Sequence, residues 1–146
     1  MSYKVCVLTG TRADYGLLRE LLFRLSNNNE VELAIIVTGS HLSAAFGDTQ
    51  REIINDGFEN FIRIPIPLED DSKGGMANST GIALCKFSEY FTSAQPDILI
   101  VLGDRYEALS AVIAARMQSI PVAHISGGDV TEGAIEKAKL PGRLQR

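Results

Sequence analysis

Residues 4–16 read K-V-C-V-L-T-G-T-R-A-D-Y-G, and this stretch is the strongest indication of the fold. Lys4–Thr9 is apolar without in–out alternation, which is typical of a strand buried on both faces of a sheet. A glycine turn follows at Gly10, and leucines then recur at helical spacing until Ser26 ends the pattern. These leucines are Leu17, Leu18, Leu21, Leu22 and Leu25. The stretch predicts a strand, a polar turn and a helix.

The same strand–helix alternation continues along the chain. Further strands are predicted at Val31–Val37, Phe61–Ile64, Asp97–Leu102 and Pro121–Ile125. Helices are predicted from Thr49 to about Gly57, from Met76 to Ala94, and from Tyr106 to Gln118. Thr38–His41 and Pro65–Gly75 are predicted loops. The alternation indicates the α/β class, with a doubly wound, Rossmann-like parallel sheet.

Composition narrows the classes of protein that fit. The 146 residues suit one domain, with 45% hydrophobic and 22% charged residues. A net charge of -4 argues against a nucleic-acid partner, and no apolar run reaches the roughly 20 residues of a membrane span. The start of the chain lacks a signal-peptide pattern, so we expect a cytoplasmic protein. Cys6 and Cys85 are predicted to be buried, because neither has metal-site or redox-pair spacing.

Polar and glycine residues concentrate in the loops that follow the first, fourth and fifth strands. These loops are Gly10–Gly16, Gly103–Glu107 and Ser126–Gly133. If the strand order is 3-2-1-4-5, the three loops converge outside the carboxyl ends of the strands, where ligands bind in such sheets. The first loop is not the G-x-G-x-x-G fingerprint of dinucleotide-binding proteins.

Each of the first two loops has a functional and a structural interpretation. Arg12 and the following helix N-terminus could bind a phosphate or carboxylate, or Asp14 could cap the helix beside a solvated Arg12. Asp104 could be an acid/base or sugar-binding carboxylate, with Arg105 holding a phosphate. Alternatively, Asp104 and Glu107 form a capping box.

The third loop and the two histidines leave similar alternatives. Asp129 and Glu132, followed by Glu136, could transfer protons to and from carbon, or could belong to a flexible acidic loop. Gly127 and Gly128 would let the backbone approach a ligand closely. For His41 and His124, the spacing favours packed or hydrogen-bonded structural roles over metal binding. Thr49 and Glu52 are a further candidate capping box.

Three motifs together resemble the hydrolysing UDP-N-acetylglucosamine 2-epimerases: G-T-R-A-D-Y-G at 10–16, V-L-G-D-R-Y-E at 101–107 and H-I-S-G-G-D-V-T-E-G-A-I at 124–135. The resemblance runs from about Lys4 to Glu136. It implies the N-terminal lobe of a glycosyltransferase-B-type architecture, with the substrate held between two lobes. It also implies removal of the proton on sugar carbon 2, elimination of UDP, and addition of water to the resulting glycal. The products would be N-acetylmannosamine and UDP, feeding sialic acid biosynthesis, and no cofactor or metal is implied.

The resemblance also assigns roles to residues. It implies substrate binding by Arg12 and Arg105. His124, Gly127 and Gly128 are further candidates for substrate binding. Asp104 would be catalytic or substrate-holding, and Glu136 stands where the family usually has an aspartate with a proposed acid/base role. Many members have a glutamate directly after His-Ile, where this chain has Ser126. Either Asp129 or Glu132 would compensate for it.

The domain organisation follows from the extent of the resemblance. We expect an epimerase lobe at residues 1–136, a divergent tail at 137–146 and no second lobe, as in a truncated gene product. A single lobe does not enclose the substrate, so we expect negligible turnover and, through exposed apolar surface, a homo-oligomer. One alternative is a stand-alone nucleotide- or phosphometabolite-binding module. Another is a related epimerase that acts on a UDP-diacetamido sugar.

Overall fold

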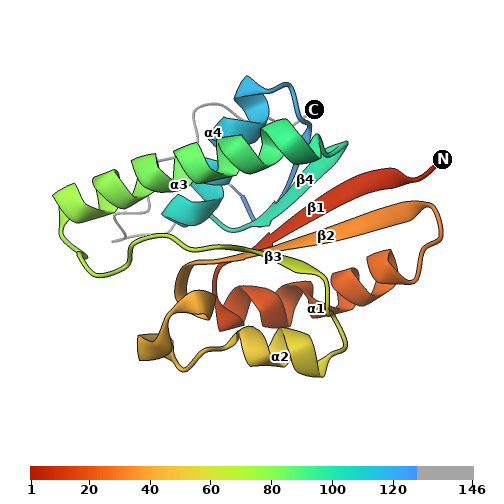
Figure 1. Cartoon of the computed structure of the whole chain (residues 1–146), viewed down its shortest axis with the longest axis horizontal. Helices are drawn as coiled ribbons and strands as arrows, with labels where there is room; N and C mark the ends of the chain where they lie inside the picture. Colours follow the sequence, from red (N-terminus) through yellow and green to blue (C-terminus); the bar gives the residue numbers. More distant parts are fainter. Residues whose placement is uncertain (128–146) are drawn as a thin grey trace.

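The structure, a computed structural model, describes residues 1–127 and contains one parallel sheet (Figure 1). Its strands are β1 (Tyr3–Thr9), β2 (Val31–Thr38), β3 (Phe61–Ile64), β4 (Ile98–Leu102) and β5 (Val122–Ile125). They lie in the order β3-β2-β1-β4-β5, and every neighbouring pair is parallel. The predicted fold class and strand order are therefore confirmed.

Helices cover both faces of the sheet, as a fully parallel sheet requires. They are α1 (Arg12–Ser26), α2 (Gln50–Asn55), α3 (Lys73–Ala94) and α4 (Tyr106–Met117), with short 3-10 turns at Gly39–Leu42 and Ala44–Phe46. Figure 1 shows α3 and α4 above the sheet and α1 and α2 below it. Within the described part of the chain, no helix is long and apolar enough to span a membrane.

Each strand feeds two cores because successive side chains point to opposite faces. In β1, Cys6 and Leu8 join the core beneath α3 and α4, whereas Val5 and Val7 join the core above α1 and α2. Phe87 of α3 fills the first core. The absence of in–out alternation in the apolar strands thus has the predicted cause.

Two element predictions were inaccurate. The helix α3 begins at Lys73 rather than at Met76, because the Ser72 hydroxyl accepts a hydrogen bond from the Gly75 N–H at 3.0 Å and caps the helix. The glycines in the first turn of α3 made this segment resemble a loop in the sequence. The predicted loop Thr38–His41 also contains most of the first 3-10 turn.

The two cysteines lie in different environments. Cys6 is buried, as predicted, and its Sγ lies 3.8 Å from the Tyr90 hydroxyl. Burial raises the pKa of the Cys6 thiol, and the contact with Tyr90 opposes that rise. The prediction for Cys85 was wrong, because this residue lies on an exposed position of α3. Helical periodicity placed Cys85 on a helix without fixing the face on which it lies.

Candidate functional site

The first polar loop joins β1 to α1 and is organised by Thr11. The Thr11 hydroxyl accepts a hydrogen bond from the Asp14 N–H at 3.1 Å, which makes Thr11 the N-cap of α1. The prediction that Asp14 caps the helix was therefore wrong, because the hydroxyl one turn earlier has that place. Asp14 lies in the first helical turn, where a carboxylate complements the helix dipole.

Arg12 lies at the start of α1 and is open to solvent. Its Nε is 2.6 Å from Glu52 Oε1 of α2, and the two side chains are 73% and 41% exposed. An exposed ion pair of this kind is worth about 1 kcal/mol or less. The structural interpretation of a solvated Arg12 fits this arrangement, and the guanidinium is free to exchange Glu52 for another anion.

The second polar loop joins β4 to α4 and centres on an ion pair. Arg105 is the N-cap of α4 and makes no side-chain capping bond, so the predicted capping box of Asp104 and Glu107 was wrong. Instead, Arg105 Nε and Nη2 each donate to a different oxygen of Glu107, both at 3.2 Å. Burial alone would lower the pKa of Arg105, but the hydrogen bonds and charge of Glu107 outweigh it and raise that pKa.

Glu107 lies where the ends of β1 and β2 approach α4. Its side chain is only 3% exposed, against 48% for Arg105. A Cβ added to Gly39, whose φ is +61°, would lie 2.8 Å from the Gly10 carbonyl oxygen and 2.9 Å from Glu107 Oε1. A Cβ on Gly10 would lie 3.7 Å from the Glu107 carboxyl carbon. These glycines leave the space that the buried carboxylate occupies.

Sequence reasoning missed the part that Glu107 plays, because it treated this residue only as a capping partner. A signal was present, since Glu107 directly precedes the run A-L-S-A-V-I-A-A of α4, which is apolar apart from Ser110. A single carboxylate on such a buried helix needs a cationic partner. Arg105 is the nearest arginine in the sequence.

His41 is a structural residue, as predicted. It is fully buried, and its ring nitrogens lie 2.9 Å from Thr9 Oγ1 and 2.8 Å from Thr49 Oγ1. Burial lowers the pKa of His41, and the negative charges of Asp14 and Glu52 partly oppose that effect. Thr49 makes no side-chain cap for α2, so the predicted capping box of Thr49 and Glu52 was also wrong.

The end of β5 is tied to the second loop. His124 Nε2 is hydrogen-bonded to the carbonyl of Gly103, and the Gly103 N–H donates to the Ile125 carbonyl at 2.9 Å. Gly127 is closely packed, since an added Cβ would overlap the His124 ring. Ser126, at the position where many family members have glutamate, has a left-handed φ of +53°. The hydrogen bond supports the structural interpretation of His124.

The predicted convergence of the loops is confirmed as far as the structure describes them. The first and second loops meet at Glu107, and the second meets the end of β5 at Gly103. Asp104 is half-buried at this junction. Four candidates lie outside the described residues: Gly128, Asp129, Glu132 and Glu136. Among residues 1–127, no group of three or more His, Cys, Asp or Glu side chains could hold a metal ion.

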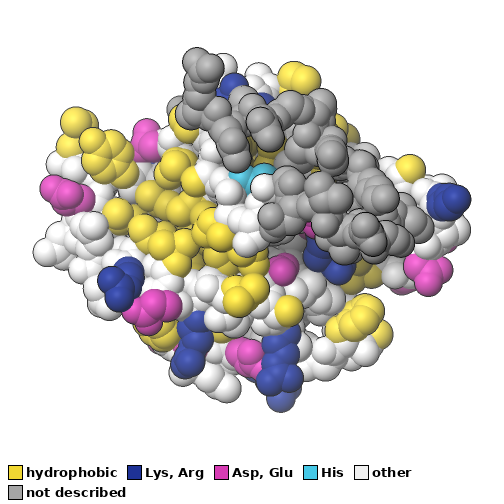
Figure 2. Space-filling view, turned by 180° about the vertical axis from the view of Figure 1, so that it is seen from behind, with side chains coloured by type: hydrophobic (Ala, Val, Ile, Leu, Met, Phe, Trp, Pro, Cys, Tyr) yellow, Lys and Arg dark blue, Asp and Glu magenta, His cyan; other side chains and the backbone are white. Residues whose placement is uncertain are grey.

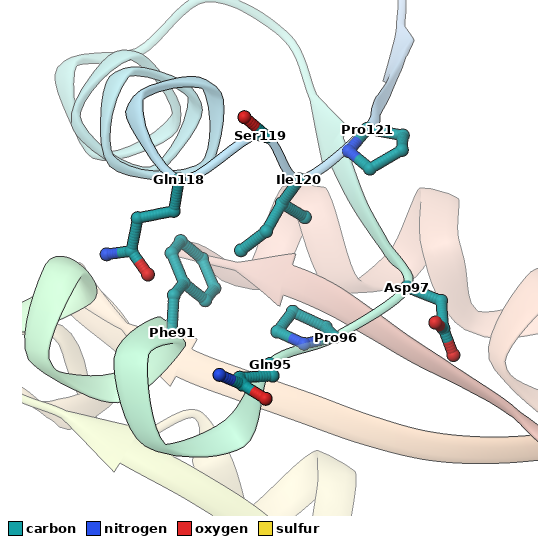
Figure 3. A pocket seen from close by; sticks show the side chains of 8 residues that line it. All are labelled: Phe91, Gln95, Pro96, Asp97, Gln118, Ser119, Ile120 and Pro121. Carbon is teal, nitrogen blue, oxygen red and sulfur yellow. The ribbon is translucent and has the colours of Figure 1, made fainter.

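Two surface hollows lie away from these loops. One, of about 320 Å³, lies at the amino ends of β4 and β5, where Figure 3 shows Phe91, Pro96 and Ile120 turned toward one another. The Gln118 amide of this hollow is engaged within the chain, since its Nε2 donates to the Ser88 carbonyl at 3.0 Å. The other, of about 430 Å³, lies between β3 and α3 and includes Lys86, which donates to the Pro65 carbonyl. Neither hollow contains residues of the polar loops.

Comparison with known proteins identifies the family of this chain. The family model described as UDP-N-acetylglucosamine 2-epimerase matches residues 24–139. The UDP-N,N'-diacetylbacillosamine 2-epimerase (hydrolyzing) of Legionella pneumophila is 46% identical over 129 residues, which are 88% of this chain and 34% of that protein. The GDP/UDP-N,N'-diacetylbacillosamine 2-epimerase (hydrolyzing) of Campylobacter jejuni is 41% identical, over 91% of this chain and 34% of that protein.

Solved structures show the same fold at lower identity. A UDP-N-acetylglucosamine 2-epimerase matches with a TM-score of 0.77 at 23% identity, over 97% of this chain and 37% of the other. The Neisseria meningitidis enzyme bound to UDP-GlcNAc matches with a TM-score of 0.71 at 22% identity, over 89% and 33%. This chain spans about a third of the length of the curated relatives, at 34% of each of the two named above. The chain therefore belongs to the UDP-N-acetylglucosamine 2-epimerase family.

Proposed function

We propose that this chain is the first lobe of a hydrolysing 2-epimerase and that its polar loops bind the diphosphate of a UDP-linked 2-acetamido sugar. The observation that carries the proposal is the convergence of the first two loops on one ion pair, with a buried carboxylate, at the carboxyl end of the sheet. Ligands of doubly wound sheets bind at this end. The family match supports the nature of the ligand.

Two arginines supply the positive charge that a diphosphate needs. Arg105 has one edge of its guanidinium on Glu107 and is 48% exposed, which leaves the other edge for an oxyanion. Arg12 lies in the first turn of α1, where the free N–H groups of the helix also favour an anion. In the proposed complex, Arg12 leaves Glu52 and binds a phosphate oxygen.

The proposed reaction breaks the C2–H bond of the sugar and then the C1–O bond to UDP, which departs with the electron pair. Water adds its hydroxyl to C1 of the glycal, and C2 regains a proton on the opposite face. Asp104, half-buried at the end of β4, is our candidate for holding the sugar or moving one of these protons. Asp129, Glu132 and Glu136 are the candidates for the remaining transfers, and His124, Gly127 and Gly128 for contacts with the substrate.

Sequence identity favours a particular sugar. The two relatives named for N,N'-diacetylbacillosamine are 46% and 41% identical to this chain, whereas the UDP-N-acetylglucosamine 2-epimerase of Neisseria meningitidis is 30% identical. We therefore propose a UDP-diacetamido sugar as the substrate of the complete enzyme, with UDP-N-acetylglucosamine as the alternative. Competition for UDP bound to the purified chain tests this preference. It is supported if the UDP-diacetamido sugar displaces UDP more strongly than UDP-N-acetylglucosamine does.

Self-association is also part of the proposal. Figure 2 looks at the side of the molecule that is distant in Figure 1, and apolar side chains gather there in one area. Exposed apolar residues of the described chain include Leu17 of α1 at 75% and Ile125 of β5 at 37%. We expect sedimentation velocity to show dimers at high protein concentration and fewer dimers for Leu17→Lys. A monomer at all concentrations would contradict this part of the proposal.

Isothermal titration of the purified chain with UDP and with each UDP-sugar tests the proposed function. We expect Arg12→Ala to weaken the binding of UDP about tenfold, as loss of one charge-assisted hydrogen bond does. Arg24→Ala is the matched control, because Arg24 is also on α1, is 78% exposed and pairs with Glu20 at 2.9 Å. Absence of binding at millimolar UDP, or equal effects of both variants, would contradict the proposal.

A further inference from the structure

The buried Glu107 is an unusual component of this core. Among residues 1–127, it is the one Asp, Glu, Lys or Arg residue that is buried. Its neighbours along α4 include Ala108, Ala111 and Ala115, which are all buried and apolar. Replacing a buried ion pair by well-packed apolar residues is often neutral or stabilising, so packing alone does not account for a carboxylate here.

The geometry of the pair defines what Glu107 does to Arg105. A guanidinium has five N–H groups in a rigid plane, and Glu107 accepts from Nε and from Nη2. The plane of the arginine fork is thereby fixed, and three N–H groups remain free of Glu107, one on Nη2 and two on Nη1. Because the buried Glu107 carboxylate lies close to Gly10 and Gly39, the pair is positioned at the ends of β1 and β2.

We propose that Glu107 is a positioning residue for ligand binding, which orients the free edge of Arg105 toward a phosphate oxygen of the bound nucleotide. The inference rests on the proposed function, because it takes the ligand to be a diphosphate. Glu107 is too buried to contact that ligand directly and acts through Arg105. Arginine loses less freedom on binding when its fork is already oriented, which strengthens the bidentate contact.

The test combines two measurements on three variants. Glu107→Gln keeps the size and loses the charge, Arg105→Lys keeps a charge beside Glu107 and loses the fork, and the double variant completes a cycle. Glu20→Gln is the control, since Glu20 accepts from Arg24 Nε at 2.9 Å on the exposed surface of α1. Circular dichroism and urea unfolding establish that each variant is folded.

The first measurement needs no ligand. Nitrogen-15 relaxation of the Arg105 Nε–H group should give an order parameter near that of rigid backbone, about 0.8, and below about 0.6 in folded Glu107→Gln. Glu20→Gln should leave the Arg105 value unchanged. An Arg105 Nε–H group that is mobile in the unsubstituted chain, or equally ordered in Glu107→Gln, would overturn the positioning role.

The second measurement is titration with UDP. We expect Glu107→Gln to weaken binding at least fivefold and Arg105→Lys about tenfold, while the double variant matches Arg105→Lys. A full additional loss in the double variant would overturn the inference, because Glu107 would then act independently of Arg105. The unsubstituted chain could bind no UDP while the order parameters behave as expected. In that case Glu107 orients Arg105 but not toward a diphosphate, and both the proposed ligand and the inference are overturned.

Discussion

The two ends of the parallel sheet differ in whether their polar side chains are buried. At the carboxyl end, Glu107 and His41 are buried with the hydroxyl of Thr9. At the amino end, Asp97 is exposed, and it exchanges hydrogen bonds with Lys4 at 2.8 and 2.9 Å. Exposed polar pairs such as that of Asp97 and Lys4 are sufficient for a stable fold. Buried polar groups carry a large free-energy penalty unless their partners are matched in geometry, so stability alone does not require them.

The polar groups at the carboxyl end are constrained by more than packing. In the amino-end hollow, the Gln118 amide and the Asp97 carboxylate are hydrogen-bonded within the chain, and no arginine or lysine among residues 1–127 lines the hollow to bind an anion. At the carboxyl end, two arginines keep exposed donors, and one of them, Arg105, is paired with a buried carboxylate. The comparison therefore predicts large effects of substitution at one end and small effects at the other.

The largest expected effect is that of Gly39→Ala. Alanine is strained at a φ of +61°, and its Cβ would lie 2.8 Å from the backbone oxygen of Gly10, which cannot move aside freely. We expect the free energy of unfolding to fall by about 3 kcal/mol in urea denaturation. The matched control is Gly81→Ala in α3, where a Cβ meets nothing within 4 Å. It should stabilise the chain by about 0.8 kcal/mol. Equal effects of the two variants would contradict the claim that the carboxyl end is more tightly constrained.

Arg105→Ala should have the next largest effect, because it leaves the Glu107 carboxylate buried and unpaired. Breaking a buried pair costs about 3–5 kcal/mol, and the half-exposed Arg105 lets water reach the pair, so we expect about 2 kcal/mol. Adding Glu107→Gln should recover part of this loss. Unchanged stability of Arg105→Ala in urea denaturation would mean that the pair is weaker than its geometry indicates.

Acidification should destabilise the chain through His41. Burial lowers the pKa of His41 in the folded state below the ordinary value of 6.5. As the pH falls through 6.5, the unfolded chain therefore binds a proton at His41 before the folded chain does. Stability is therefore unaffected by this group well above pH 6.5 and falls as the pH is lowered through that value. Urea denaturation between pH 8 and pH 5.5 should show this slope, and folded His41→Gln should reduce it. An unchanged slope in the variant would assign the dependence to other groups.

The smallest effect is expected at the amino end. Asp97→Ala removes an exposed hydrogen bond to the Lys4 N–H and should lower the free energy of unfolding by about 1 kcal/mol or less. It should leave the binding of UDP unchanged, since Asp97 lies at the end of the sheet away from the loops. A loss of UDP binding in Asp97→Ala would place the ligand site at the amino end of the sheet and contradict the proposed site.

The sequence was sufficient to predict the fold because continuous apolar runs alternate with segments of helical periodicity. Continuous apolar runs predicted buried strands, and the strand order followed from general rules for parallel sheets. The site was predicted less completely. Three capping assignments failed because Asp14, Asp104 and Thr49 fitted local spacing rules, whereas the hydroxyl of Thr49 bonds His41 across the fold. The role of Glu107 depends on Gly39, a residue 68 positions earlier in the chain (107 − 39), and no local pattern reports such a contact.

The central claim is that the nucleotide binds at the carboxyl end of the sheet. It is tested most directly by titrating nitrogen-15-labelled chain with UDP and following the backbone amide resonances. We predict that shifts concentrate in the first two loops, at residues 10–15 and 103–107. The amino-end hollow, at residues 95–97 and 118–120, should stay unchanged. Shifts confined to the hollow, or no shifts at saturating UDP, would contradict the account.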